Sequence, residues 1–215
     1  MVVEMDDATQ KQVQEMFSDL IDDVTIHLFI EEINCLYCND VKDMVDQLAE
    51  LSDKVSVQEH KGSLDAADAK EMGIERTPAL VLHGKKPYNV KFYGIPAGHE
   101  FGALVGSIVD VSKGTTPLPQ DVVEDIASID KPINIKVFVT PQCPYCPNMT
   151  RLGAQAAIIN PLISSEMIES LEFQEETAKY EVFGVPKTIL NETTSIEGLS
   201  PIEMFVEKLF EAVGN

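Results

Sequence analysis

The chain has little that would suit it to a nucleic acid or a membrane. It holds 16 Lys and Arg against 36 Asp and Glu in 215 residues, a formal net charge of −20. Phosphate backbones and anionic lipid surfaces would repel so acidic a protein. Its longest apolar runs, such as Val137 to Val139, are far too short to cross a bilayer. We therefore expect no nucleic-acid partner and no membrane association, and we interpret the acidity as a solvated surface.

The marks of secretion are also missing. Residues Met1 to Asp7 carry three acidic residues and no basic one, unlike the start of a secretory signal. Only four cysteines occur, all in two close pairs, Cys35-Leu-Tyr-Cys38 and Cys143-Pro-Tyr-Cys146. A disulfide scaffold would link distant segments, and a bond within Cys-x-x-Cys closes too short a loop to add much stability. We expect a cytoplasmic protein whose cysteines serve chemistry.

Other catalytic signatures are absent from the sequence. There is no phosphate-binding glycine loop, no Ser/His/Asp signature and no paired-carboxylate motif. The four histidines have no short metal-ligand spacing to one another or to the cysteines; they are His27, His60, His83 and His99. We expect strand or surface roles for them, no metal site, and no cofactor beyond redox-active disulfides.

The cysteine pairs belong to a sequence repeat. Pro78 follows Cys35 by 43 residues, and Pro186 follows Cys143 by the same 43. The two copies are offset by 108 residues, about half of the chain, which favours two small domains over one large one. The stretch Gly114-Thr-Thr-Pro-Leu-Pro119 has the composition of a linker between them.

Hydrophobic periodicity predicts the same order of elements in both halves. In the first half we expect helices over Met5–Leu20, Val41–Leu51, Leu64–Met72 and Glu100–Val111, and strands over Val24–Ile30, Val55–Glu59, Ala79–Leu82 and Tyr88–Tyr93. In the second we expect helices over Val122–Ile129, Met149–Ile159, Glu175–Val182 and Pro201–Val213, and strands over Ile133–Val139, Ile168–Phe173, Pro186–Leu190 and Thr194–Glu197. The second copy then has a longer link from Asn160 to Met167 and a shorter hairpin.

Each cysteine pair lies where a strand leads into a helix. A helix N-terminus favours the thiolate through its unpaired N–H groups and brings a cysteine pKa down to roughly 3.5 to 7.5. A second cysteine about one turn along the helix can then release a bound substrate. We interpret Cys35 and Cys143 as the nucleophiles and Cys38 and Cys146 as the resolving cysteines. The loop residues between them are Leu36, Tyr37, Pro144 and Tyr145.

A four-cysteine zinc site is the alternative for two Cys-x-x-Cys pairs. Zinc-binding pairs usually lie roughly 15 to 20 residues apart, whereas 104 residues separate Cys38 from Cys143. The pairs also open long helices in separate units. We favour redox chemistry and keep a zinc-bound module as the less favoured alternative.

The spaced prolines indicate a second element of each site. We expect Thr77-Pro78 and Val185-Pro186 to be cis, because a cis X-Pro turn leaves the preceding backbone able to hydrogen-bond. That backbone would then pair with an extended substrate beside each cysteine pair.

These motifs together resemble a known family. Cys-x-x-Cys after a strand, followed by Met72-Gly-Ile-Glu-Arg-Thr-Pro78 or Tyr180-Glu-Val-Phe-Gly-Val-Pro186, resembles the thioredoxin/glutaredoxin fold with its cis-proline loop. With Gly94-Ile-Pro-Ala-Gly-His-Glu-Phe101, the doubled arrangement is similar to the archaeal protein disulfide oxidoreductases. The resemblance implies an α/β protein of two tandem thioredoxin-like domains, 1–116 and 117–215. Each would be a mixed four-stranded sheet flanked by helices, with an extra N-terminal helix.

The same resemblance implies an activity and its partners. It implies thiol–disulfide exchange on protein substrates, with reduction by a thioredoxin-reductase-type flavoenzyme. The alternative is an electron relay that serves a peroxiredoxin-type system. Oxidation, reduction and isomerisation use the same residues and differ in reduction potential, so the direction stays open.

The chain also departs from the family pattern. Phe29 and Val137 stand where thioredoxins carry a buried aspartate, so a base for the resolving thiol must come from elsewhere. Glu31 and Glu32 lie near the first pair in sequence, and we expect both to be solvated. Because the loop of Cys143-Pro-Tyr-Cys146 matches glutaredoxins, we predict that this is the principal site and that the first pair is a redox centre of different potential.

Overall fold

The computed structural model of the chain describes residues 5–31 and 35–214, with eight helices and eight strands among them. The first half holds α1 (Asp7–Phe17), β1 (Val24–Ile30), α2 (Cys38–Glu50), β2 (Val55–Lys61), α3 (Ala67–Glu71), β3 (Ala79–His83), β4 (Pro87–Tyr93) and α4 (His99–Lys113). The second holds α5 (Gln120–Ala127), β5 (Ile133–Val139), α6 (Cys146–Ile159), β6 (Ile163–Glu169), α7 (Gln174–Lys179), β7 (Lys187–Leu190), β8 (Thr194–Glu197) and α8 (Ile202–Ala212). The extra N-terminal helix is confirmed as α1, and the second hairpin is the shorter one, as expected.

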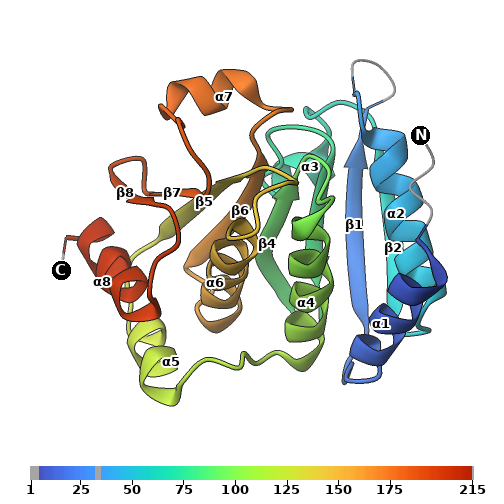
Figure 1. Cartoon of the computed structure of the whole chain (residues 1–215), viewed down its shortest axis with the longest axis horizontal. Helices are drawn as coiled ribbons and strands as arrows, with labels where there is room; N and C mark the ends of the chain where they lie inside the picture. The colour runs from blue at the N-terminus through green and yellow to red at the C-terminus, as the bar shows by residue number, and fades with distance from the viewer. Residues whose placement is uncertain (1–4, 32–34, 215) are drawn as a thin grey trace.

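All eight strands form one sheet, in the order β2-β1-β3-β4-β6-β5-β7-β8 (Figure 1). Each half contributes four strands in mixed arrangement: β1 is parallel to β2 and antiparallel to β3, and β5 stands in the same way to β6 and β7. The prediction of two mixed four-stranded sheets is confirmed. The halves join where β4 and β6 pair in parallel, Val90–Tyr93 against Ser165–Ile168, so the two sheets are fused edge to edge.

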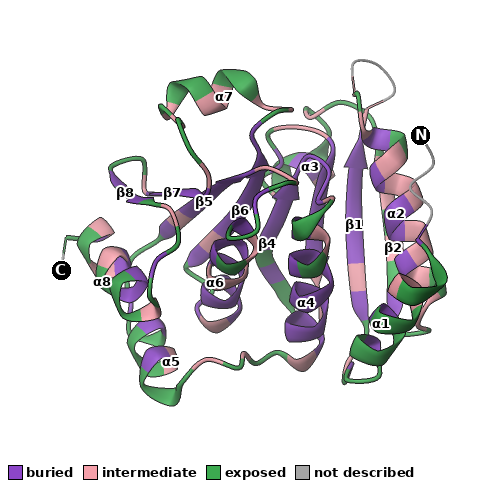
Figure 2. Cartoon of the chain, in the orientation of Figure 1, coloured by how far each residue is buried: buried purple, intermediate pink, exposed green. Residues whose placement is uncertain are grey.

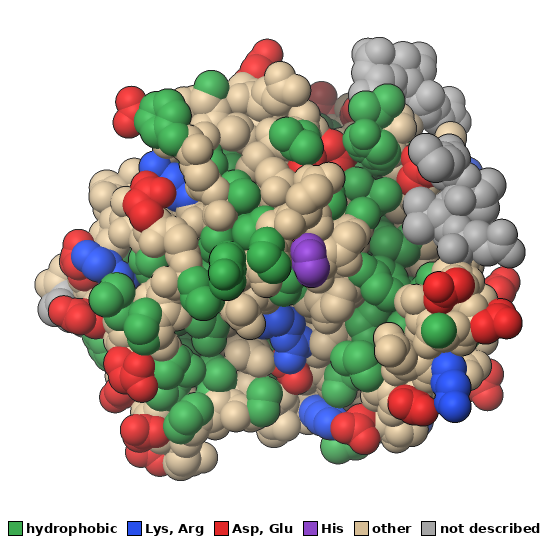
Figure 3. Space-filling model, in the orientation of Figure 1, with side chains coloured by type: hydrophobic (Ala, Val, Ile, Leu, Met, Phe, Trp, Pro, Cys, Tyr) green, Lys and Arg blue, Asp and Glu red, His purple; other side chains and the backbone are tan. Residues whose placement is uncertain are grey.

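The two faces of this sheet are covered differently. Alternating strand residues such as Ile26 and Leu28 point into a large core shared with α1, α2, α4, α5, α6 and α8. Phe29 and Val81 point the other way, into a smaller cluster that Ala69 of α3 joins. Figure 2 shows the strands and the inward faces of the large helices as buried, while Figure 3 shows hydrophobic side chains over the centre of one face and acidic ones around its rim. In the described part of the chain, no helix combines the length and apolarity that a membrane span needs.

The position of β6 corrects one prediction. The expected strand over Ile168–Phe173 is wrong, because the strand runs over Ile163–Glu169, and the longer link before it does not exist. As a central strand between β4 and β5, β6 is covered on both faces yet holds polar side chains. Ser165 and Glu166 are 3% and 5% exposed, and Glu166 accepts a hydrogen bond from the Asn134 side chain at 2.9 Å. Buried polar residues hid this strand from a search for apolar runs.

Candidate active site

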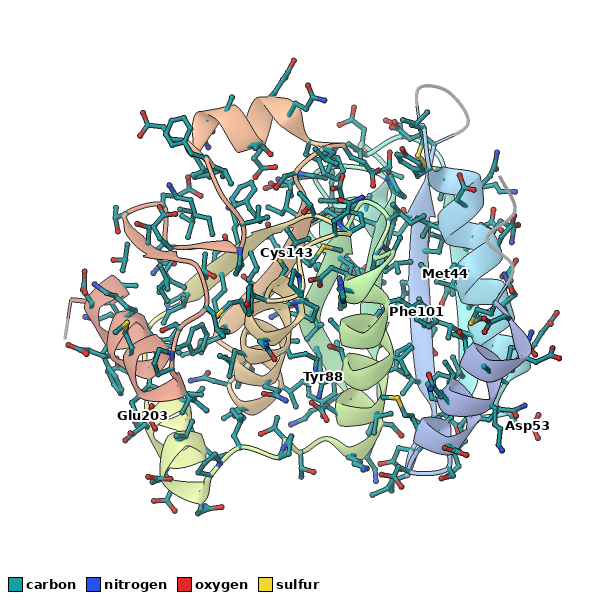
Figure 4. All side chains as sticks on the ribbon, in the orientation of Figure 1. Met44, Asp53, Tyr88, Phe101, Cys143 and Glu203 are labelled. Atoms are coloured by element: carbon teal, nitrogen blue, oxygen red, sulfur yellow. A yellow bond between two sulfur atoms is a disulfide. The ribbon has the colours of Figure 1, made fainter. Side chains whose placement is uncertain are left out.

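Both cysteine pairs follow strands that end on the same side of the sheet. β1 and β4 are each antiparallel to β3, and β4, β6 and β5 are parallel, so β1 and β5 end on one side. The helices that follow begin at Cys38 and Cys146, the second cysteine of each pair. The expectation that the second cysteine lies a turn inside the helix is therefore wrong: the first cysteine occupies the turn before it. Figure 4 shows Cys143 near the start of α6.

Each pair forms its own disulfide, Cys35–Cys38 and Cys143–Cys146. Cys38 and Cys146 are 3% and 0% exposed, Cys143 is 7% exposed, and Cys35 is half-buried. The Cys146 backbone N–H donates a hydrogen bond to the Cys143 sulfur at 3.1 Å. A backbone donor aimed at this sulfur favours its thiolate. The first cysteine of each pair is thus the more exposed residue, as a nucleophile requires.

Between the cysteines, the two loops present different side chains to solvent. Leu36 is 79% exposed in the first loop, and Tyr145 is 58% exposed in the second. Pro144 is also exposed, whereas Tyr37 is half-buried against the core. Each loop thus presents an apolar side chain to solvent between its two cysteines.

The two proline loops adopt the predicted conformation. Thr77-Pro78 and Val185-Pro186 are both cis. Ala79 pairs with Phe29 and Lys187 with Phe138, so each loop lies beside the end of the strand that leads to its cysteine pair.

The same hydrogen bond holds both loops. Pro78 C=O accepts from Gly94 N–H at 2.9 Å, and Pro186 C=O accepts from Gly198 N–H at 2.8 Å. Within the described residues, Thr77 and Val185 make no turn or loop hydrogen bond through their backbones. Their main-chain groups remain available to another strand.

The space beside each proline loop differs between the halves. In the first half it is a cavity of about 10 Å³, which is lined by Phe29, His60, Lys61, Gly62, Ser63, Leu64, Ala66, Asp68, Ala69 and Thr77. In the second half the equivalent space is an open groove of about 570 Å³. Leu171 and Phe183, which are 59% and 94% exposed, line this groove together with Val185. The second site therefore offers a larger space with apolar side chains along it.

The two glutamates after β1 have different outcomes. Glu31 is half-buried, and its carboxylate accepts a hydrogen bond from the Thr77 hydroxyl at 3.4 Å. It therefore contacts the first proline loop while it stays partly solvated. Glu32 lies outside the described residues.

Glu100 is a buried acid that the sequence analysis did not single out. It lies in the first turn of α4, is 1% exposed, and among the described residues neither carboxylate oxygen has a well-formed hydrogen bond. Burial raises the pKa of Glu100 to about 7, and the Thr150 hydroxyl offsets part of that rise. Thr150 follows Cys146 by four residues on α6, so the two share one helix face. Glu100 therefore faces the side of α6 that carries Cys146.

The loop before α4 brings the first half against the second site. His99 N–H donates to Pro141 C=O at 3.1 Å, and Ile95 N–H donates to the Glu172 carboxylate at 2.6 Å. Burial raises the pKa of Glu172 to about 7, with a further contribution from the charge of Glu169. The turn before Cys143 is thus built partly on residues of the other half.

Three of the four histidines gather on neighbouring strands. His27 Nδ1 lies 3.0 Å from His60 Nε2, and the His27 and His83 rings are 4.4 Å apart. His60 Nδ1 lies 2.5 Å from Asp68 Oδ2, and burial with the two other rings lowers the pKa of His27 to about 4. His99 is exposed at the start of α4. The described residues include no group of three or more His, Cys, Asp or Glu side chains placed to hold a metal ion.

Known proteins share this arrangement. The thioredoxin domain family matches residues 133–211. The solved protein disulfide oxidoreductase of Aeropyrum pernix is 26% identical, with a TM-score of 0.91 over 100% of this chain and 96% of that one. The chain has the tandem thioredoxin fold. It is homologous to thiol–disulfide oxidoreductases and has two Cys-x-x-Cys disulfides.

Two further relatives of this tandem thioredoxin-fold chain are alkyl hydroperoxide reductases. The NTD_N/C domain of the Enterococcus faecalis enzyme has the same fold, with a TM-score of 0.90 and 24% identity over 96% of this chain and 100% of that one. An alkyl hydroperoxide reductase protein of Staphylococcus epidermidis is 26% identical over 172 residues, 80% of this chain and 31% of that protein. The chain spans about a third of the length of the curated relatives it matches.

Proposed function

We propose that this protein is a protein disulfide oxidoreductase that exchanges dithiols and disulfides with polypeptide substrates. The observation that carries the proposal is the repeated combination of a Cys-x-x-Cys disulfide before a helix and a proline loop beside it. The N–H of Cys146 on the Cys143 sulfur supports Cys143 as the attacking thiolate. Residues 1–116 and 117–215 are the two functional units in this proposal.

Reduction of a substrate then takes two displacements. The Cys143 thiolate attacks one sulfur of the substrate disulfide, so a mixed disulfide forms and the other substrate sulfur leaves as a thiolate. Cys146, once deprotonated, attacks the Cys143 sulfur, which closes the Cys143–Cys146 disulfide and releases the second substrate thiolate. Two electrons pass to the substrate, and oxidation runs the same steps in reverse. Cys35 and Cys38 carry out the equivalent chemistry in the first half.

The proton of Cys146 needs an acceptor, and Glu100 fits this role best. Its pKa of about 7 lets it accept and return a proton near neutral pH. Its position beside Thr150, on the side of α6 that carries Cys146, supports this role. Phe29 and Val137, both buried and apolar, offer no alternative.

Substrate binding is assigned to the proline loops. The free backbone groups of Thr77 and Val185 would pair with an extended segment beside each disulfide. Pro78 and Pro186 fix those loops against Gly94 and Gly198. The apolar groove of the second half supports that half as the principal polypeptide site.

The proposed electron donor is a thioredoxin-reductase-type flavoenzyme, in a cytoplasmic setting. A second function, electron relay to a peroxiredoxin-type partner, is favoured by the similarity to the alkyl hydroperoxide reductases. In a relay, one cysteine pair would accept electrons from the reductase and the other would deliver them.

Insulin reduction by dithiothreitol tests the proposal. Cys143→Ser should lose most of the catalysed rate, Cys35→Ser should lose less, and the double variant should fall to the uncatalysed rate. Full activity in the double variant would contradict the proposed mechanism. A reduced protein that reduces a peroxiredoxin far faster than insulin would instead favour the relay.

A further inference from the structure

Arg76 reaches from the first half into the second. It stands two residues before Pro78, and its Nη2 lies 2.9 Å from a carboxylate oxygen of Glu176 on α7. The guanidinium carbon is 4.3 Å from the centroid of the Tyr93 ring and 5.8 Å from that of Phe173. Its side chain is 14% exposed and that of Glu176 is 16% exposed, so this ion pair is shielded far more than a surface pair.

Hydrogen bonds anchor the backbone of the loop that carries Arg76. Gly73 C=O accepts hydrogen bonds from Lys91 Nζ at 2.8 Å and from the Tyr93 hydroxyl at 3.2 Å. Both donors belong to β4, the strand at the joint between the halves. The segment that carries Arg76 and Thr77 is therefore held on the centre of the sheet.

α7, in contrast, has no buried residue to anchor it. It is six residues long and none of them is buried, as Figure 2 shows for the short helix beyond the end of the sheet. The Thr177 hydroxyl bonds only within its own segment, to Ser170 C=O and Phe173 C=O. At its far end Lys179 pairs with Glu192. Phe173 and Tyr180, which flank α7, pack against the smaller cluster. Within the helix itself, Glu176 and Lys179 contact other elements through their ion pairs.

One wall of the groove at the second site comes from α7. Gln174, Thr177 and Ala178 line it opposite the loop that carries Phe183 and Val185. The equivalent of Arg76 in the second half is Gly184, two residues before Pro186, which has no side chain to reach back. Of these two equivalent positions, only Arg76 therefore has a side chain that reaches into the other half.

We propose that Arg76 is a positioning residue for the second site: by holding Glu176 it fixes α7 and so sets the shape of the polypeptide groove beside Val185. The inference rests on the proposed function for its consequence, since the groove matters only if polypeptides react there. It makes a residue of the first proline loop a determinant of substrate binding at the second.

The test uses the full chain with Cys35→Ser and Cys38→Ser, so that only the second site reacts. Arg76→Met keeps an unbranched side chain between the aromatic rings but removes the charge. We expect KM for insulin to rise about tenfold, equivalent to about 1.4 kcal/mol, with kcat nearly unchanged. The rate with the small disulfide dithiobis(nitrobenzoate), which needs no groove, should stay as in the parent. Arg76→Lys should give an intermediate KM.

Glu175→Gln is the matched control, because Glu175 is an exposed neighbour on the same helix. It should leave KM for insulin unchanged. Glu176→Gln should raise KM as Arg76→Met does, and the two together should raise it no further. Equal losses with insulin and the small disulfide, or additive effects of the two variants, would overturn the inference.

Hydrogen exchange gives a readout that does not depend on turnover. Amides of residues 174–185 should exchange faster in Arg76→Met than in the parent or in Glu175→Gln. Unchanged protection would overturn the positioning role. If the parent reduces neither disulfide, the proposed function fails, and the exchange rates alone still decide whether Arg76 positions α7.

Discussion

Glu100 links protonation to stability at the scale of one residue. Its pKa is raised by burial from 4.5 to about 7, so between these values the folded chain keeps a proton that the unfolded chain has lost. The stability from the neutral carboxyl is present below pH 4.5 and is lost as the pH rises through 7. The raised pKa of Glu100 corresponds to a loss of roughly 3 kcal/mol in the free energy of unfolding at high pH.

Glu100→Gln should therefore stabilise the chain in alkaline solution. Glutamine cannot ionise, so the free energy of unfolding of the variant should exceed that of the wild type by up to roughly 3 kcal/mol at pH 8 and by little at pH 5. Urea unfolding at both pH values measures this. Glu203→Gln, an exposed residue in the first turn of α8, is the control and should show no such trend. An equal difference at pH 5 and pH 8 would contradict ionisation as the cause.

The same substitution tests the catalytic role. Release of a mixed disulfide at Cys143 should slow by about 100-fold at pH 7 in Glu100→Gln, because the Cys146 thiol loses its proton acceptor. Formation of the mixed disulfide should not change. Single-turnover measurements separate the two steps, and a loss in both would argue against a role confined to Cys146.

Residue-scale features were predictable where chemistry fixes them locally. The cysteine pairs and cis prolines follow from spacing along the chain. Glu100 does not, because its burial depends on α4 packing against α6 of the other half. One signal was present: Glu100 shares a helical face with Ala103, Leu104 and Ser107, all of which are buried.

Gly98 allows the start of α4 to pack closely against the turn before Cys143. Its φ is 59°, and a Cβ there would lie 2.4 Å from the carbonyl oxygen of Pro141, in the turn before Cys143. Gly98→Ala should therefore cost about 1 to 3 kcal/mol of stability and displace that turn. The catalysed rate at Cys143 should fall more than the rate at Cys35, as each single-site variant can show.

Gly102→Ala is the matched control within the same helix. A Cβ at Gly102 meets nothing within 4 Å, and the residue is exposed in α4. This substitution should stabilise the chain by roughly 0.5 to 1 kcal/mol and leave both sites unaffected. Equal behaviour of the two variants would contradict the proposed contact with the turn.

Element-scale prediction failed where a buried strand carries polar side chains. β1 and β5 have the boundaries expected from their apolar runs, because each sends alternate side chains into the main core. β6 was misplaced because its Ser165 and Glu166 find partners inside the protein. A single sequence shows polarity but not the partner that satisfies it.

The continuous sheet makes the whole molecule one structural unit. Besides the joint of β4 and β6, Arg151 Nη2 on α6 lies 2.5 Å from Asp110 Oδ2 on α4, and Gln155 donates to the same oxygen at 3.1 Å. The sequence predicted two domains but not this fusion, since strand edges carry no local signal for their partner.

Unfolding should therefore be cooperative across both halves. We expect a single calorimetric transition with equal calorimetric and van't Hoff enthalpies. Arg151→Met removes the cationic partner of buried Asp110, so the free energy of unfolding should fall by roughly 2 to 4 kcal/mol while the transition stays single. Two resolved transitions would mean that the halves fold as independent domains.

The joint between the halves has a consequence for how chains meet one another. β4 is the hairpin edge of the first half and β6 the parallel edge of the second, while the free edges, β2 and β8, are of the same two kinds. A contact between unlike edges is heterologous, so copies joined from β8 to β2 would extend into a ring or an open polymer. β8 is only four residues long, exposes Ser195 and Glu197, and belongs to a chain of net charge −20. The repeated halves make pairing of β8 in one copy with β2 in another geometrically possible. The short length of β8 and the repulsion between acidic copies oppose it.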